Sequence, residues 1–317
     1  MNFLRLIGLI ATLVIFLCCA VPLQFLAQRR FPHLSARMTQ NFAQLLLRIL
    51  RIRINCATRS ERTGARLLIA NHISWIDILA LASVESASFV GKSEIARWPL
   101  VSTFAKVERT IYIDRKRRRS IIPANRMMAD CLASNRDVLL FPEGTTGAGN
   151  GLLKFHSSHF AAPGLALTAM PERESVPVQP ILIRYSSATA AWIGDMSLIP
   201  HIWQVLREKP IVCELLYGPA LDHQRDTNRK VMTQKARAIM ECLQEAPELE
   251  ARHAATSRQI IQPGRPMLVP VQNSSHSPGM EREPAGSSWC GLSFEESAAS
   301  LTACRADSES MRQFTGN

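Results

Sequence analysis

The chain has 317 residues, of which 47% are hydrophobic and 20% charged, and its formal net charge is +11. That length suffices for one large core or two modest ones, and the composition excludes a small disulfide-stapled fold and a fully disordered chain. Residues 254–317 carry five arginines and six acidic residues, so residues 1–253 carry about +12. Such a basic body suits an anionic partner: nucleic acid, a membrane surface or a phosphorylated substrate.

The first predicted element is an apolar segment at the N-terminus. Residues 6–28 contain no charge, and a helix over Leu6–Leu26 would be about 31 Å long, enough to cross a hydrocarbon core. A cleaved signal peptide is the alternative, but the stretch is too long and no good A-x-A site follows it. The sequence therefore predicts a retained membrane segment.

A second helix is predicted over Ser35–Leu50, where apolar residues recur at helical spacing. It either lies in the membrane interface with its arginines on anionic headgroups or covers a protein core. Residues 1–60 hold eight arginines and no acidic residue, and only Arg5 precedes the apolar segment. By the positive-inside rule, everything after residue 28 is expected in the cytoplasm. We therefore predict membrane-anchoring helices over residues 1–50.

Strand-like and helical patterns alternate from residue 51 onward. The strand-like runs are 51–56, 66–70, 87–91, 110–114, 137–141, 178–185 and 211–217, and helical patterns lie near 75–84, 93–106, 120–134, 155–168 and 226–247. The alternation predicts an α/β domain over residues 51–253, with a mostly parallel sheet flanked by helices. Residues 254–317 are rich in Ser, Pro, Gly and Ala and are predicted to form a disordered tail.

The eight cysteines are scattered along the chain without a C-x-x-C pair or metal-ligand spacing. This inventory is typical of a reduced compartment without a disulfide framework. His156 and His159 are spaced like two metal ligands on one helix, but no third ligand is evident, and we interpret them as part of an ordinary helix.

The first motif that could carry chemistry follows the apolar run 66–70. His72 and Asp77 are five residues apart, about 140° apart on one continuous helix, so they would not face each other there. They can meet if His72 lies in a loop and the helix starts near Ser74. Asp77 would then hold one imidazole nitrogen and leave the other as a base. Alternatively, Ser74 and Asp77 form a helix-capping box.

A second motif, Phe141–Thr146, follows the apolar run 137–141. Pro142 and Gly144 end the strand in a turn, at the sheet edge where α/β proteins usually bind ligands. Glu143 is thus either a site residue or a turn carboxylate. A third motif ends the run 110–114 at Arg115, which could donate to an anion. The basic residues after it lack the interleaved aromatics of a nucleic-acid platform, and no nucleic-acid partner is expected.

Taken together, the motifs resemble those of the 1-acylglycerol-3-phosphate acyltransferase family. They match in order and spacing across about residues 50–220, at Asn71–Asp77, Gly91–Glu94, Ile111–Arg115, Phe141–Thr145 and Val176–Pro180. The resemblance implies an α/β acyltransferase with an N-terminal helical membrane motif. Together with the arginine distribution, this leads us to expect the catalytic domain at the cytoplasmic face of the inner membrane. The resemblance further implies acyl transfer from acyl-CoA or acyl carrier protein to the free hydroxyl of 1-acylglycerol-3-phosphate, giving phosphatidic acid, without a metal or other cofactor.

The resemblance also assigns roles to matched residues. His72 would be the general base that deprotonates the acceptor hydroxyl, and Asp77 would orient it. No serine nucleophile is needed, and no G-x-S-x-G motif is present. The implied substrate-binding residues are Lys92 and Arg115 for the anionic headgroup, and Glu143, Gly144 and Thr145 at the acceptor site.

Two departures leave alternatives for the acceptor open. Thr146 stands where the family often has a phosphate-binding arginine, and Arg109 stands where a glycine is common. In both respects the chain is similar to a branch that includes lyso-ornithine-lipid acyltransferases, so a lyso-ornithine lipid or another lysolipid is the alternative acceptor. More distant alternatives are a membrane-tethered esterase and a membrane protein without enzymatic activity.

Overall fold

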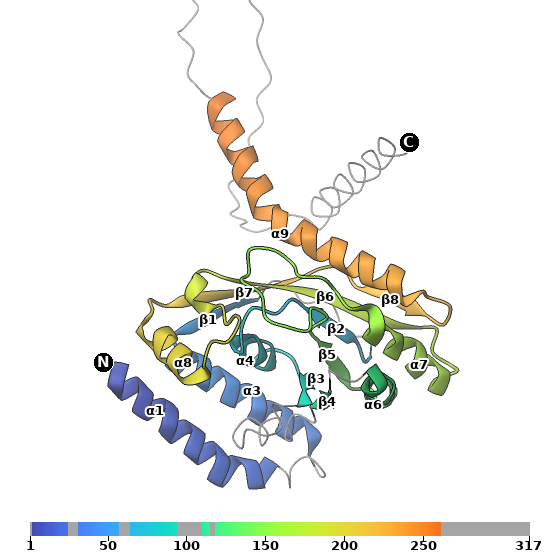
Figure 1. Cartoon of the computed structure of the whole chain (residues 1–317), viewed down its shortest axis with the longest axis horizontal. Helices are drawn as coiled ribbons and strands as arrows, with labels where there is room; N and C mark the ends of the chain where they lie inside the picture. Colours follow the sequence, from blue (N-terminus) through green and yellow to red (C-terminus); the bar gives the residue numbers. More distant parts are fainter. Residues whose placement is uncertain (1, 25–30, 57–63, 94–109, 115–117, 261–317) are drawn as a thin grey trace, which may run out of the picture. The chain divides into compact units, whose positions relative to one another are not determined.

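The computed structural model describes residues 2–24, 31–56, 64–93, 110–114 and 118–260 (Figure 1). Residues 1–244 form one compact unit and residues 245–317 a second. Within the described residues, eight strands form one sheet in the order β1-β7-β6-β2-β5-β3-β4, and β8 pairs with β6. The strands are β1 (Ile52–Cys56), β2 (Leu67–Ala70), β3 (Ala87–Lys92), β4 (Ile111–Ile113), β5 (Asp137–Leu140), β6 (Ser175–Tyr185), β7 (Ile211–Tyr217) and β8 (Leu221–Gln224).

The prediction of a mostly parallel α/β sheet is confirmed. Strands β4, β3, β5, β2 and β6 run in one direction, and β7 and β8 are antiparallel to β6. All seven predicted runs are strands, and only the short β8 was not predicted. Because these strands are parallel, the carboxyl ends of β2, β3 and β5 lie at one edge of the sheet.

Helices cover both faces of the sheet. On β2, Leu67 and Ile69 face one hydrophobic cluster while Leu68 and Ala70 face another, and all four are buried. Both faces are thus covered, which is why the strand is apolar throughout instead of alternating. The first cluster includes α6 (Ile121–Ala133), α7 (Ala162–Ala169) and α9 (Arg229–Ile260), and the second α3 (Pro32–Ile49), α4 (Ile76–Ala82) and α8 (Leu198–Arg207).

Several helices differ from their predicted bounds. The pattern 155–168 begins as a 3₁₀ turn, Ser157–Ala161, before α7, and α8 was not predicted. Helix α9 continues to Ile260, so residues 254–260, assigned to a disordered tail, are helical, and the Ala, Arg and Gln residues there favour a helix. The predicted helix 93–106 lies almost wholly, and the tail from residue 261 wholly, outside the described residues.

The N-terminal segment differs from the single α-helix that was predicted. Helix α1 (Asn2–Ile15) is followed by a π-helical turn, Phe16–Ala20, which interrupts the α-helical repeat. Gln24 is buried and donates hydrogen bonds to the Ser35 carbonyl at 3.1 Å and to Thr39 Oγ1 at 2.6 Å, so it faces α3. Among the helices of the described residues, none combines the length and apolarity needed to span a bilayer.

A buried ionic cluster lies at the edge of the sheet where β2 begins. Arg66, just before β2, donates to Asp137 Oδ2 at 2.9 Å and to Glu85 Oε2 at 3.1 Å. The Arg66 backbone amide also donates to Asp137 Oδ1, and the Tyr217 hydroxyl donates to Glu85 Oε1. These bonds join the amino end of β2 to that of β5 and to the carboxyl end of β7.

Candidate active site

His72 and Asp77 meet just beyond the carboxyl end of β2. His72 lies in the loop after β2, and Asp77 lies in the first turn of α4. The distance between His72 Nδ1 and Asp77 Oδ2 is 2.8 Å, although the residues are five apart. The loop makes this contact possible because it frees the pair from the spacing of a continuous helix.

Asp77 is fully buried and accepts four hydrogen bonds. Its Oδ2 accepts from His72 and from the backbone amides of Ile73 and Ser74, at 2.7 and 2.9 Å. One oxygen thus serves the helix start and the imidazole. It makes one half of the capping box that the sequence offered, because Ser74 Oγ has no hydrogen-bond partner among the described residues. Oδ1 accepts from the Tyr185 hydroxyl at 2.7 Å.

Tyr185 is a site residue that the sequence analysis missed. It is the last residue of β6, which runs parallel to β2 and ends at the same edge of the sheet. Burial and the charge of Asp77 raise the pKa of the Tyr185 phenol well above its ordinary value, so the hydroxyl keeps its proton and donates. A tyrosine ending an apolar strand, one strand away from the motif, was the available signal.

His72 is held on several sides. Its ring stacks on Phe141, with ring centroids 4.1 Å apart, and its backbone amide donates to Glu143 Oε2 at 2.8 Å. The neighbouring Asn71 side chain exchanges two hydrogen bonds with the Ile183 backbone of β6. These contacts fix the loop that carries the imidazole. The side chain of His72 is 16% exposed.

Glu143 supports the loops of the site through its backbone contacts. Its Oε2 accepts from the His72 amide and its Oε1 accepts from the Leu153 amide, each at 2.8 Å. Burial raises the pKa of the Glu143 carboxyl, and these two backbone bonds oppose that effect. The sequence analysis assigned Glu143 to substrate binding. In the structure, both of its oxygens are used to join the two loops.

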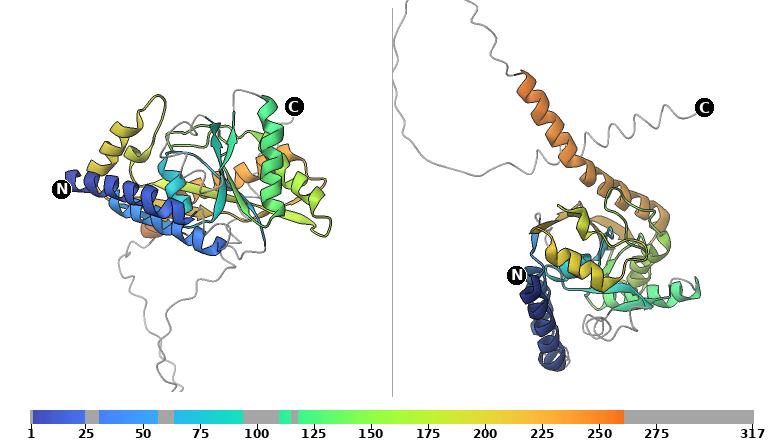
Figure 2. Two further views of the ribbon diagram at one scale, coloured as in Figure 1. Left: turned by 90° about the horizontal axis from the view of Figure 1, so that it is seen from below. Right: turned by 60° about the vertical axis from the view of Figure 1, so that its left-hand side comes forward.

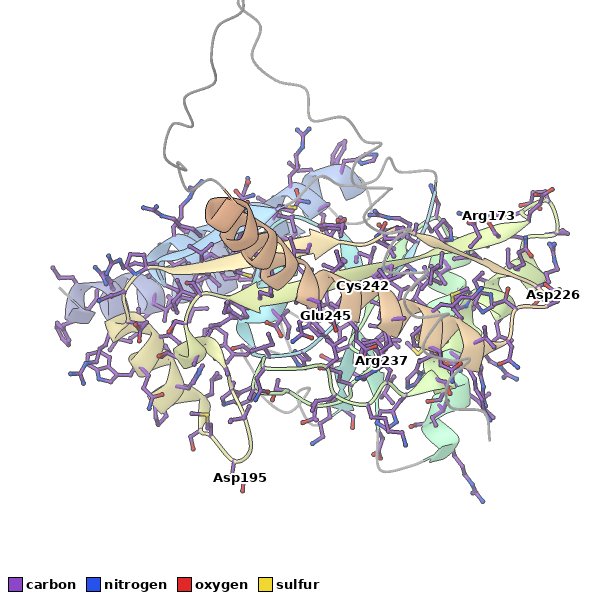
Figure 3. All side chains as sticks on the ribbon, turned by 90° about the horizontal axis from the view of Figure 1, so that it is seen from above. Arg173, Asp195, Asp226, Arg237, Cys242 and Glu245 are labelled. Carbon is purple, nitrogen blue, oxygen red and sulfur yellow. The ribbon has the colours of Figure 1, made fainter. Side chains whose placement is uncertain are left out.

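The loop 144–153 lies against the His72 loop. Gly144 and Gly149 have φ angles of 72° and 83°, a backbone region that side-chain-bearing residues rarely adopt. The Gly147 amide donates to the His72 carbonyl at 2.8 Å. From α9, Arg237 (labelled in Figure 3) donates to the carbonyls of Leu152 and Leu153, so α9 holds the far end of this loop.

The other predicted substrate-binding residues are placed as follows. Lys92 is partly buried at the end of β3, whose carboxyl end lies at the same edge of the sheet as the His72 loop. Gly144 is partly buried and Thr145 is exposed, both in the turn after β5. Arg115 lies outside the described residues. Of the two histidines considered as metal ligands, His159 contacts Asn125 Oδ1 at 2.8 Å and His156 is exposed.

This arrangement can perform general base chemistry. Because the Asp77 carboxylate accepts from Nδ1, the imidazole carries its proton there, and Nε2 can accept a proton from a hydroxyl. The buried carboxylate stabilises the imidazolium that would then form. The pair thus supplies a base, His72, and the carboxylate that orients it, Asp77. It supplies no nucleophile, so a bound substrate would have to provide one.

Comparisons with known proteins show what the chain is similar to. A family model described as "Acyltransferase" matches residues 51–184. The lyso-ornithine lipid O-acyltransferase of Rhizobium meliloti is 36% identical to this chain, over 57% of this chain and 66% of that protein. The lyso-ornithine lipid O-acyltransferase of Brucella abortus is 30% identical, over 75% of this chain and 94% of that protein. A 1-acyl-sn-glycerol-3-phosphate acyltransferase of Neisseria gonorrhoeae is 29% identical, over 55% and 68%.

A solved structure shares the fold. The crystal structure of the 1-acyl-sn-glycerophosphate acyltransferase PlsC from Thermotoga maritima matches with a TM-score of 0.54, covering 76% of this chain and 94% of that one. The sequence identity is 13%, so this match supports the mixed α/β architecture alone.

Proposed function

This chain belongs to the family of lysophospholipid and glycerolipid acyltransferases, and on that premise we propose that it transfers a fatty acyl group to the hydroxyl of a lysolipid. The observation that carries the proposal is the 2.8 Å contact between His72 and a fully buried Asp77 at the carboxyl edge of a parallel sheet. The donor is an acyl thioester, acyl-CoA or acyl carrier protein.

The proposed step is a direct transfer. His72 Nε2 takes the proton of the acceptor hydroxyl as its oxygen attacks the thioester carbonyl. The tetrahedral intermediate collapses, the C–S bond breaks, and the thiolate takes the proton back from the imidazolium. The products are an ester and a free thiol. Asp77 holds the imidazole throughout, and Tyr185 holds Asp77.

We propose a lyso-ornithine lipid as the favoured acceptor. The Brucella relative, covered over 94% of its length, carries that name, and Thr146 offers a neutral hydroxyl where the family often has arginine. Lysophosphatidic acid is the second candidate, supported by the Neisseria relative and by the cations Lys92 and Arg115 at motif positions. A phosphate monoester carries roughly two charges and needs matching donors.

We also propose that residues 1–50 anchor the chain at the cytoplasmic face of an inner membrane, with residues 51–253 as the acyltransferase domain. Supporting this, α1 exposes Phe3, Leu4, Ile7 and Ile10, between 48% and 71%. Exposed apolar area of this kind can insert into one leaflet, and the arginines of this region suit anionic headgroups.

An acceptor panel tests this function. The purified protein is given a labelled acyl thioester with lyso-ornithine lipid, with lysophosphatidic acid or without a lysolipid, and products are identified by mass spectrometry. We expect a diacyl product with lyso-ornithine lipid and slower turnover of lysophosphatidic acid, improved by Thr146→Arg. Free fatty acid as the main product in every arm would support an esterase instead. Preference for lysophosphatidic acid would reverse the assignment of the acceptor.

A further inference from the structure

Helix α8 and the loop before it carry an apolar face on the protein surface. Ile199 is 80% exposed, the highest value among the large hydrophobic side chains that are exposed in the described residues. The opposite side of α8 is buried in the core through His201, Val205 and Leu206. The exposed apolar residues of this segment therefore do not form part of the core. They are Ile193, Met196, Ile199 and Trp203, called here the α8 face.

The α8 face adjoins the N-terminal helix. Ile202 of α8 packs against the hydrophobic cluster formed by α1 and α3, and Arg5 of α1 donates to the Leu206 carbonyl at 3.5 Å. Figures 1 and 2 show α8 beside α1. The two exposed apolar surfaces thus come from neighbouring elements that are far apart in sequence.

The same segment is bonded to the candidate active site. Trp75, between His72 and Asp77, donates from Nε1 to His201 Nδ1 at 2.9 Å. The Trp192 amide donates to the Ile73 carbonyl at 2.9 Å. The segment that carries the α8 face is therefore hydrogen-bonded directly to the loop that holds the imidazole.

The charges within the segment 193–209 balance one another. Asp195 lies at the outer tip of the loop (Figure 3), Glu208 follows the helix, and Arg207 and Lys209 are both exposed. Arg5 of α1 adds a single positive charge beside α8. With so small an excess, apolar contact would carry most of the binding, so salt would weaken it little. Tryptophan with aliphatic neighbours is typical of side chains that sit at a membrane–water interface.

We propose that the α8 face is a second bilayer contact, which lies on the lipid surface together with α1 and keeps the active-site loop close to the acceptor in the membrane. This rests on the proposed function only in that the acceptor is a membrane lipid. The binding itself requires only a bilayer.

The test uses the full-length protein and vesicles of phosphatidylethanolamine and phosphatidylglycerol without acceptor. Brominated acyl chains in these vesicles should quench tryptophan fluorescence through Trp203, and Trp203→Phe should remove most of that quenching. Ile199→Glu should weaken it strongly, at low and at high salt. Gln204→Glu is the matched control, since it places the same carboxylate at an exposed polar position of the same helix. Asp195→Asn should strengthen quenching without lowering the melting temperature, which distinguishes this gain from binding by misfolded protein.

Kinetics separate this proposal from the proposed function. For a lysolipid embedded in vesicles, Ile199→Glu should raise KM by about tenfold, the effect of losing one buried aliphatic side chain. For a short-chain, water-soluble acceptor it should leave KM and kcat unchanged. Equal quenching in Ile199→Glu and Gln204→Glu would overturn the α8 face, and so would a dimer in solution that Ile199→Glu dissociates. If the wild type acylates neither the vesicle-embedded nor the water-soluble acceptor, the proposed function fails. The quenching result would still decide whether the α8 face contacts the bilayer.

Discussion

At the scale of single residues, the proposed chemistry depends on His72. Replacing it with alanine removes the base, and we expect kcat to fall by about 10²–10⁴-fold. The fold should persist, since His72 lies in a loop. His156→Ala is the matched control, because it removes an exposed imidazole from the loop before α7. Turnover should be measured beside the melting temperature. A His72→Ala enzyme with near wild-type kcat would end the general base assignment.

Tyr185 provides a second residue-scale prediction. Tyr185→Phe removes only the hydroxyl that donates to Asp77 Oδ1. Bonds to charged groups contribute about 1.5–3 kcal/mol, so the melting temperature should fall. Because Asp77 also loses one of its restraints, kcat should fall about three- to tenfold while KM stays constant.

Tyr217→Phe is the control for this variant. It removes a hydroxyl that donates to Glu85 at 2.8 Å, remote from His72 and also at the end of a strand. It should lower the melting temperature by a similar amount and leave kcat unchanged. Equal kcat values for the two variants would reduce Tyr185 to a purely structural residue.

At the scale of elements, Glu143 joins the His72 loop to the loop 144–153. Glu143→Gln keeps the shape, but an amide offers only one acceptor oxygen for the two backbone amides. Leaving a buried amide unpaired costs about 1–3 kcal/mol, and less is expected here because both bonds are only partly buried. We expect faster hydrogen exchange at the His72 or Leu153 amide together with a lower kcat. Glu174→Gln, at an exposed position just before β6, should change neither. Unchanged exchange at both amides would contradict this role for Glu143.

The proposed membrane anchor is also an element-scale feature. The combined variant Leu4→Gln, Ile7→Gln and Ile10→Gln removes apolar area from the exposed side of α1. Since insertion depends on that area, we expect high salt to extract the variant from membranes but not the wild type. Ile122→Gln with Met127→Gln is the control, because it removes exposed apolar residues from α6 instead. Retention of the α1 variant after the salt wash would argue against anchoring by this surface.

At the scale of the whole molecule, two buried histidines couple stability to pH. Burial lowers the pKa of His201 and of His223 below the ordinary value of 6.5. As the pH falls below 6.5, the unfolded state therefore binds protons before the folded state does. Their contribution to stability is present above pH 6.5 and is lost as the pH falls, by up to about 1.4 kcal/mol per pH unit for each histidine.

Melting temperatures between pH 7 and pH 5 test this coupling. His201→Gln and His223→Gln should each flatten the loss of stability over that range, whatever they do to the melting temperature at pH 7. His156→Gln, which changes an exposed histidine, should leave the slope as it is in the wild type. A slope unaffected by either buried substitution would show that other groups control the acid sensitivity.

The sequence by itself determined the order of strands along the chain and the mostly parallel sheet, and it identified His72 and Asp77 as residues that can meet. These follow from local patterns: short apolar runs, a loop after a buried strand, and an aspartate in the first turn of a helix. The resemblance of the motifs to an acyltransferase family added the proposed reaction.

Only the tertiary structure decided which partners these residues have. Tyr185 lies 108 positions from Asp77, and β6 brings it there by pairing with β2. Glu143 could be a ligand or a turn carboxylate until its two backbone donors were located. The α8 face arises because a helix that was not predicted turns one side to the core and leaves the other side exposed. Pairing and packing between distant segments depend on the whole chain, and local periodicity does not encode them.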